Sequence, residues 1–316
     1  MSAAMVSASA PAKAILIGEH AVVYGRPAIA IPLPDIRAEA DVAAGEPGSG
    51  VRLLAPDLDR VVLVGASPLD DPLAVTVANT LTYLGIAAPP DLVVTLRSAI
   101  PLARGMGSGA AISTALVRGL AAYFERPLGP DEVSALVYKT EVLFHGTPSG
   151  IDNTVVAYGR PVYFVRGAAP EPLAVGGALR FLIADSGVAS PTRVAVGDVR
   201  AGWLAETQRY ERLFDRIAAT VADARRAIAR GDATRLGEAM NAAQECLSEI
   251  GVSSPELDHL VAAARGAGAL GAKLSGGGRG GIALAVVDAG READVADALR
   301  RAGAVRVMGA TLRAAG

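Results

Sequence analysis

The sequence predicts a protein of mixed helices and strands that folds as two domains. Its 316 residues exceed the usual length of one domain. In the first half, short segments rich in Val, Ile, Leu and Ala alternate with helical patterns, whereas Ala-rich helices dominate after about residue 180. We therefore predict domains over 1–180 and 181–316, with the boundary at this change of pattern.

The individual elements follow from periodicity and from the turn residues that bound each segment. Strands are predicted over 5–9, 13–17, 51–55, 61–65 and 90–100, and helices over 72–84, 110–124 and 131–144. Near the C-terminus we predict strands over 181–187, 282–288 and 304–311, and a helix over 291–303.

Composition indicates a folded globular protein, because 51% of the residues are apolar, 20% are charged and the net charge is −2. This balance gives no sign of a nucleic-acid partner. The first residues lack the basic segment of a signal peptide, and no stretch reaches the length of a membrane span. We expect no membrane association, a cytoplasmic location, and a buried apolar role for the single cysteine, Cys246.

A Gly-rich segment, PLARGMGSGAA at 101–111, lies between a predicted strand and a predicted helix. Gly105, Gly107 and Gly109 let the backbone approach a ligand, and the helix start offers free amides and a positive dipole end. These features favour a phosphate-binding loop. A dinucleotide fingerprint and a purely structural turn stay open, whereas the absence of a following Lys excludes a Walker A loop.

Two carboxylates stand eleven residues apart in KTEVLFHGTPSGIDN, at 139–153. Thr147 and Pro148 are suited to the N-cap and first position of a helix that would carry Asp152 in its second turn. Glu141 and Asp152 would then converge, one to hold magnesium on phosphates and the other to receive a hydroxyl proton. A helix cap and a solvated charge are the alternative.

The segment APAKAILIGEHAVVYG, at 10–25, places Lys13 on a strand and puts Glu19 and His20 in the turn after it. Taken alone, these residues are typical of an edge-strand charge and a satisfied histidine. However, the chain has only three lysines, Lys13, Lys139 and Lys273, among many arginines. A retained lysine hints that a compact ammonium is needed.

The last motif, KLSGGGRGGIALAVV at 273–287, puts five glycines directly before a buried strand. Such a run costs conformational entropy and is expected where the backbone closely approaches a ligand or another loop. A tight turn between two elements is the alternative.

In this order, the four segments resemble those of the GHMP kinase superfamily, and PAKAILIGEHAVVYG with HGTPSGIDN resembles its mevalonate kinases in particular. The likeness extends from Lys13 to Gly281. It implies an α+β protein, with a left-handed crossover in the N-terminal domain and a ferredoxin-like C-terminal domain. ATP would lie in the cleft between the domains and would phosphorylate the 5-hydroxyl of mevalonate. A homodimer stays open.

The resemblance also assigns roles to residues. It implies that Asp152 and Lys13 are catalytic, that Glu141 binds Mg²⁺, and that Glu19, His20 and Thr192 bind the substrate. In place of the family's serine ligand, we expect a water on the ion, with the Ser108 hydroxyl as the alternative oxygen. The implied ATP-binding residues are Arg104, Gly105, Met106, Gly107, Ser108, Gly109, Ala110, Gly276, Gly277 and Gly278.

Three positions depart from the family pattern. Gly109 replaces the usual serine ligand of magnesium, Arg104 stands where a small residue is usual and is similar to homoserine kinases, and Arg279 replaces a glycine. Because a fold and its phosphate loops do not determine the substrate, a kinase for homoserine, a sugar or phosphomevalonate is an alternative. A non-catalytic sensor is another, against which the joint presence of Lys13, Glu141 and Asp152 argues.

Overall fold

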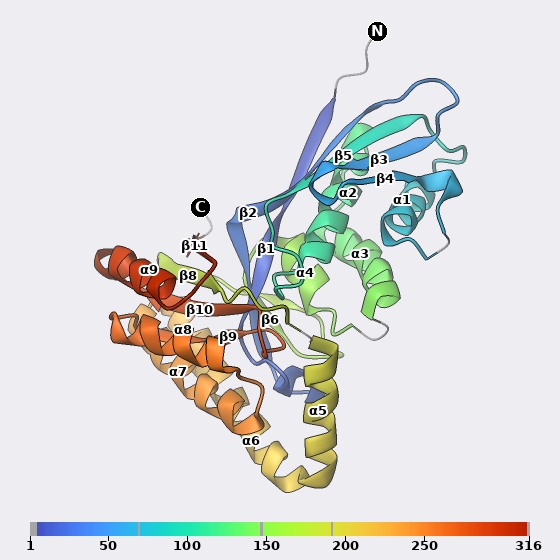
Figure 1. Ribbon diagram of the computed structural model, residues 1–316. Coiled ribbons are helices and arrows are strands. Elements are labelled where there is room, and N and C mark those ends of the chain that lie inside the picture. Colours follow the sequence, from blue (N-terminus) through green and yellow to red (C-terminus); the bar gives the residue numbers. More distant parts are fainter. Residues whose placement is uncertain (1–4, 69, 146–147, 191, 315–316) are drawn as a thin grey trace. The chain divides into compact units, whose positions relative to one another are not determined.

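Figure 1 shows the computed structural model, which describes residues 5–68, 70–145, 148–190 and 192–314. The chain forms two compact units that interleave along the sequence. The first unit comprises 1–12, 36–101 and 107–159, and the second comprises 13–35, 102–106 and 160–316. Residues 13–35 belong to the same unit as most of the C-terminal half, so these units are not continuous segments of the chain. They do not test the predicted division into 1–180 and 181–316, which stays a prediction.

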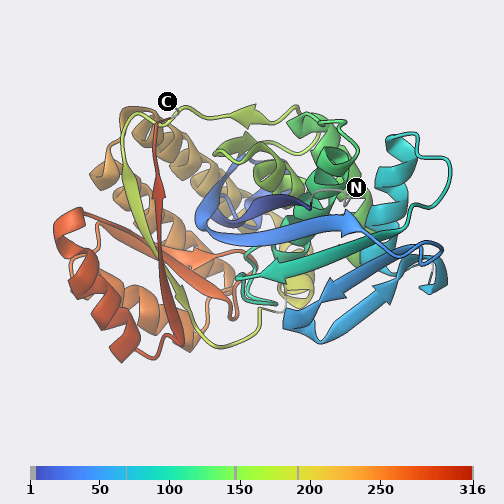
Figure 2. The same ribbon diagram turned by 90° about the horizontal axis from the view of Figure 1, so that it is seen from above.

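The first unit is a twisted sheet with helices on it (Figure 2). Its strands follow the order β4 (Arg60–Leu63), β3 (Val51–Ala55), β5 (Leu92–Ser98) and β2 (Ala28–Ala44), and β1 (Val6–Ile17) also pairs with β2. Strands β3 and β5 are parallel, so the chain crosses over between them through α1 (Pro72–Tyr83). Helices α2 (Ser108–Tyr123), α3 (Pro130–His145) and α4 (Ile151–Tyr158) complete the unit.

The second unit contains an antiparallel sheet in the order β11 (Arg306–Leu312), β8 (Leu179–Asp185), β10 (Ile282–Val287) and β9 (Gly271–Ser275). Helices α6 (Thr207–Arg230), α7 (Ala233–Ile250), α8 (Pro255–Gly266) and α9 (Glu292–Arg301) connect these strands, and Figure 1 shows α7 and α8 against the sheet. This order and these crossings make a ferredoxin-like arrangement, as expected from the resemblance.

Shorter elements complete the second unit. Helix α5 (Thr192–Ala205) precedes α6, β6 (Val162–Phe164) pairs with the start of β2, and β7 (Glu171–Pro172) pairs with β6. Short 3-10 helices occur in both units, η1 (Ala21–Tyr24), η2 (Pro56–Leu58), η3 (Val64–Ala66) and η4 (Ala289–Arg291).

Local patterns predicted most of these elements, with two corrections. The strands predicted over 5–9 and 13–17 form one continuous strand, β1. Strand β2 was not predicted because it contains Pro32 and Pro34, which normally argue against a strand. Both prolines lie between the part of β2 that pairs with β6 (28–30) and the part that pairs with β5 (38–44), so neither interrupts those ladders.

Two further expectations concern the single cysteine and membrane-spanning helices. Cys246 is buried on α7, as predicted, and burial raises the pKa of its thiol. Within the residues that the structure describes, no helix combines the length and the apolar character that crossing a membrane requires.

Candidate active site

The Gly-rich loop leads directly into α2. Gly105 and Gly107 have φ angles of 75° and 70°, in the left-handed region that favours glycine, and Gly107 is the N-cap of α2. Gly107 has no side chain with which to cap the first amides of this helix, and the first turn contains no acidic residue. The helix start therefore keeps amides available for an anion.

Two oxygen-bearing side chains of the first unit belong to this region. The Oγ atom of Ser108 is buried and has no hydrogen-bond partner among the described residues. A Cβ atom placed on Gly109 would lie 3.5 Å from Oε1 of Glu141, which is 4% exposed on α3. Hydroxyl and carboxylate oxygens are the ligands that Mg²⁺ prefers, so the residues present fit a magnesium site.

The second carboxylate, Asp152, lies in the first turn of α4. The predicted second-turn position was wrong, because the helix begins at Ile151 with Gly150 as its N-cap rather than at Pro148. Thr147, the predicted cap, lies outside the described residues. The Nδ2 atom of Asn153 donates to the Ser134 hydroxyl at 2.8 Å and thereby attaches α4 to α3.

In the second unit, the strand that carries Lys13 is bonded to the Gly-rich loop. The Lys13 amide donates to the Met106 carbonyl at 3.0 Å, and the Lys13 side chain is 4% exposed. Strand β1 therefore fixes the backbone of the loop at the residue before Gly107.

The turn after β1 has an unusual backbone. Gly18 has a φ of 108°, and a Cβ there would lie 2.5 Å from the Ala28 Cα, which only glycine avoids. His20 has a φ of 59°, a strained conformation for a residue with a side chain. Such strain persists where surrounding contacts hold it, and it is common at functional sites.

Burial determines the protonation of His20, and a contact with Gly277 determines which ring nitrogen carries the proton. The Nε2 atom of His20 lies 3.1 Å from the Gly277 carbonyl oxygen. Burial lowers the pKa of His20 to about 4, although the Gly277 bond opposes this shift. The ring is therefore neutral near pH 7 and donates from Nε2, which makes Nδ1 the acceptor nitrogen.

This low pKa predicts acid sensitivity. In the unfolded chain, histidine takes up a proton below about pH 6.5, whereas folded His20 resists protonation down to a pKa of about 4. Stability should therefore fall as the pH drops between these values, by about 3 kcal/mol from this group alone. Urea unfolding at several pH values should show a shallower acid loss for His20→Gln, and an identical loss would contradict the prediction.

Glu19 forms a buried ion pair with Lys273. The Lys273 side chain is 0% exposed and that of Glu19 is 2% exposed. Burial lowers the pKa of Lys273, an effect that the adjacent Glu19 carboxylate opposes. The second oxygen of Glu19, Oε2, is buried without a hydrogen-bond partner in the described part of the chain.

The last motif holds His20 and the start of α5 together. A Cβ on Gly277 would lie 2.8 Å from the Thr192 Cα, so glycine is needed for this close approach. Since the Gly277 carbonyl also bonds His20, two of the predicted substrate-binding residues meet at one glycine. The expected close approach of the backbone to another segment thus accounts for at least part of this Gly-rich run.

The two unusual arginines have carboxylate partners. Arg104 pairs with Asp185 at 3.0 Å and donates to the Gly187 carbonyl at 3.0 Å, which attaches the Gly-rich loop to the end of β8. Arg279 pairs with Asp198 on α5. An ATP contact of Arg104, like those of Gly276 and Gly278, stays a prediction.

Sequence reasoning assigned no role to Lys273 or Asn153. The scarcity of lysine was a signal for Lys273, but its partner lies 254 residues away in the sequence. No local pattern connects such distant residues.

Comparison with known proteins shows which family the chain belongs to. The family model described as GHMP kinases N terminal domain matches residues 73–160, and the one described as GHMP kinases C terminal matches 224–305. The chain is 34% identical to the mevalonate kinase of Thermococcus sibiricus, over 96% of this chain and 95% of that protein. It is 37% identical to the mevalonate kinase of Aeropyrum pernix, over 90% and 89%.

Solved structures show the same fold. The crystal structure of L. major mevalonate kinase with R-mevalonate superposes with a TM-score of 0.84 at 29% identity, covering 98% of this chain and 96% of that one. Mevalonate kinase of Methanococcus jannaschii superposes with a TM-score of 0.86 at 22% identity, covering 99% of this chain and 99% of that one. The chain therefore belongs to the GHMP kinases, and within them to the mevalonate kinase family.

Proposed function

We propose that the protein transfers the γ-phosphate of ATP to the 5-hydroxyl of mevalonate and releases 5-phosphomevalonate and ADP. Likeness to mevalonate kinases along nearly the whole chain supports this acceptor. The structural observation that carries it is the meeting of His20 and Thr192 at Gly277. There, a neutral imidazole offers Nδ1 to a hydroxyl of the acceptor.

In this mechanism, the Asp152 carboxylate accepts the proton of the attacking hydroxyl, and the Lys13 ammonium stabilises the negative charge that develops on its oxygen. The amides at the start of α2 bind phosphate oxygens, together with the Gly-rich loop from Arg104 to Ala110. The carboxylate acts on the acceptor side, whereas the loop positions the phosphate to be transferred.

Mg²⁺ would be held by Glu141 and by the buried Ser108 hydroxyl, which has no hydrogen-bond partner among the residues that the structure describes. When bound, it neutralises charge on the ATP phosphates. Magnesium needs only one or two protein ligands because it retains several waters, so the loss of a serine at Gly109 is compatible with binding.

We further propose a cytoplasmic location and a homodimer. The single buried cysteine suits a reducing compartment, and light scattering of the purified protein tests the dimer.

A coupled ADP-release assay with mevalonate, phosphomevalonate, homoserine and galactose tests the acceptor. Turnover of mevalonate at a kcat/KM at least about tenfold above the other three supports the proposal. If another of these compounds is preferred, it replaces mevalonate as the proposed acceptor. Absence of turnover with all four would favour a non-catalytic sensor.

Lys13 and Lys139 make a matched pair for testing the ammonium. Lys13 is buried, whereas Lys139 is exposed on α3. We expect Lys13→Met to lower kcat by about 10²-fold, because a preorganised charge near the reacting oxygen is lost. Lys139→Met should leave kcat unchanged, and equal losses in the two variants would refute the assignment.

Glu141 and Gly109 test the magnesium site. Because Glu141 is the anionic protein ligand proposed, Glu141→Gln should raise the magnesium concentration needed for half-maximal rate. Gly109 has an ordinary helical backbone, and an added Cβ would make only van der Waals contact with Glu141. Gly109→Ser should therefore fold and lower that concentration. An unchanged magnesium requirement in Glu141→Gln would remove Glu141 from the site.

A further inference from the structure

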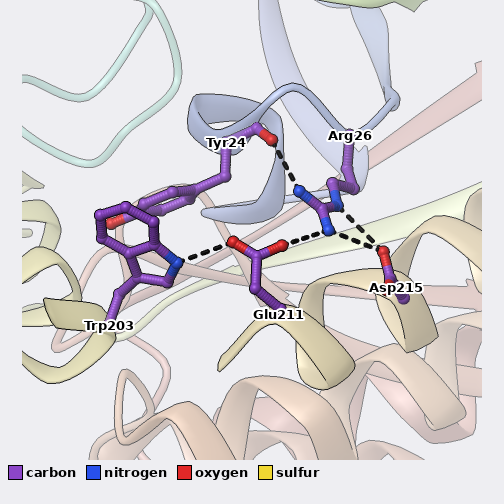
Figure 3. A network of polar contacts seen from close by, with 5 residues as sticks. All are labelled: Tyr24, Arg26, Trp203, Glu211 and Asp215. Carbon is purple, nitrogen blue, oxygen red and sulfur yellow. Dashed lines mark hydrogen bonds and ion pairs between the residues drawn. The ribbon is translucent and has the colours of Figure 1, made fainter. Parts of the chain in front are cut away.

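Figure 3 shows a polar network that begins four residues after His20. The 3-10 helix η1 ends at Tyr24, and the Arg26 side chain bends back to donate to the Tyr24 carbonyl at 3.0 Å. Arg26 also donates to Asp215 at 2.8 Å and forms an ion pair with Glu211, both on α6. Arg26 therefore attaches the segment after His20 to α6.

Glu211 extends this connection to α5. One of its carboxylate oxygens accepts from Arg26, and the other accepts from the indole Nε1 of Trp203 at 2.8 Å. The Tyr24 ring stacks on Phe214 with a centroid distance of 4.4 Å and lies 5.3 Å from the Trp203 ring. Trp203 is in the last turn of α5, so both ends of this helix have defined contacts.

The other end of α5 begins at Thr192, which touches Gly277. These contacts form a closed circuit. From His20 it follows η1 to Arg26, and Glu211 then connects Arg26 to Trp203. Helix α5 leads from Trp203 to Thr192, and Gly277 connects Thr192 back to His20. Every member of this circuit belongs to the second unit.

The ion pairs of this network contribute little to the stability of the fold. Arg26 is 23% exposed, Glu211 33% and Asp215 67%, and partly exposed ion pairs contribute little to stability. The Glu211 carboxylate instead bridges two partners, with one oxygen bonded to Arg26 and the other to Trp203. Because both bonds must be kept at once, the bridge fixes the position of Arg26 relative to Trp203. A strained residue such as His20 needs surroundings of this kind to hold its backbone.

We infer that Arg26, Glu211 and Trp203 are positioning residues for the acceptor site, which set the separation of His20 and Thr192. This inference rests on the proposed function for its link to mevalonate. Loss of the circuit weakens acceptor binding and leaves the ATP side of the reaction unaffected. Couplings through such networks amount to about 0.5–2 kcal/mol, which corresponds to about 2- to 30-fold in an affinity.

Two variants and one control test the inference. Glu211→Ala removes both links, and Trp203→Phe removes the indole donor while it keeps a ring beside Tyr24. The control is Arg216→Gln, on the same helix as Glu211, which breaks the exposed ion pair of Arg216 with Glu249 on α7, outside the circuit. Thermal unfolding of all three shows whether each variant is folded.

The kinetic measurement separates the two substrates. Glu211→Ala and Trp203→Phe should raise the KM for mevalonate by about 2- to 30-fold and leave the KM for ATP within about twofold of the control. Equal changes in both KM values, or a KM for mevalonate that matches Arg216→Gln, would overturn the inference.

A second measurement does not depend on the acceptor. NMR titration of the histidine signals should show the pKa of His20 moving from about 4 toward 6.5 in Glu211→Ala, because a released turn admits water. A pKa that stays at about 4 in this variant would show that the circuit does not hold the turn. If wild type fails to phosphorylate mevalonate, the proposed function falls, and this titration still decides the inference.

Discussion

Asp152→Asn is expected to fold, to bind ATP and to lower kcat by about 10²–10⁴-fold, the usual contribution of a general acid or base. The amide is nearly isosteric with the carboxylate but cannot accept the proton of the acceptor hydroxyl. Asp152 also lies in the first turn of α4, where the positive end of the helix dipole stabilises negative charge. The loss should appear in kcat, with little change in either KM.

Asp294 provides a matched control, because it too is an acidic residue in the first turn of a helix, α9, and is mostly exposed. Asp294→Asn should keep full activity. Steady-state kinetics and calorimetric ATP binding of both variants make the comparison. Asp152→Asn with more than about a tenth of the wild-type kcat would remove Asp152 from the catalytic role.

The elements that sequence predicted well are those with local signals. Helices α1, α2 and α3 have periodic apolar faces and clear first turns, so their predicted and observed bounds nearly coincide. Strand β2 escaped prediction because two prolines masked it. The start of α4 was misplaced because Pro148 gave a plausible but unused helix start, whereas the chain uses Gly150, with a φ of 87°, as the cap.

For the candidate site, sequence predicted residues but not the contacts between them. Motifs predicted Lys13, Glu19, His20 and Asp152 as site residues, because each stands in a short, distinctive pattern. The contacts that hold them are long-range, as with the Glu19 ion pair to Lys273 or the His20 bond to Gly277, 257 residues away. Sequence also left open whether Gly109 has a glycine-only backbone, and the structure shows an ordinary helical one.

The buried pair of Lys273 and Glu19 carries the largest expected effect on stability. Lys273→Met should lower the free energy of unfolding by about 3–5 kcal/mol, because it leaves the Glu19 carboxylate buried without a compensating charge. An exposed pair gives the control. Arg235, whose side chain is 72% exposed, pairs with Glu238 on α7, and Arg235→Gln should cost at most about 1 kcal/mol.

A double variant shows whether charge is the cause. Glu19→Gln removes the uncompensated carboxylate, so Lys273→Met with Glu19→Gln should recover much of the lost stability, since replacing both members of a buried pair is often nearly neutral. Urea unfolding of the wild type, Lys273→Met, Glu19→Gln and the double variant measures the coupling energy between the two residues. If the double variant is no more stable than Lys273→Met, the loss comes from the changed volume at residue 273. If Lys273→Met costs no more than Arg235→Gln, the pair does not hold the turn of Glu19 and His20 to the last motif.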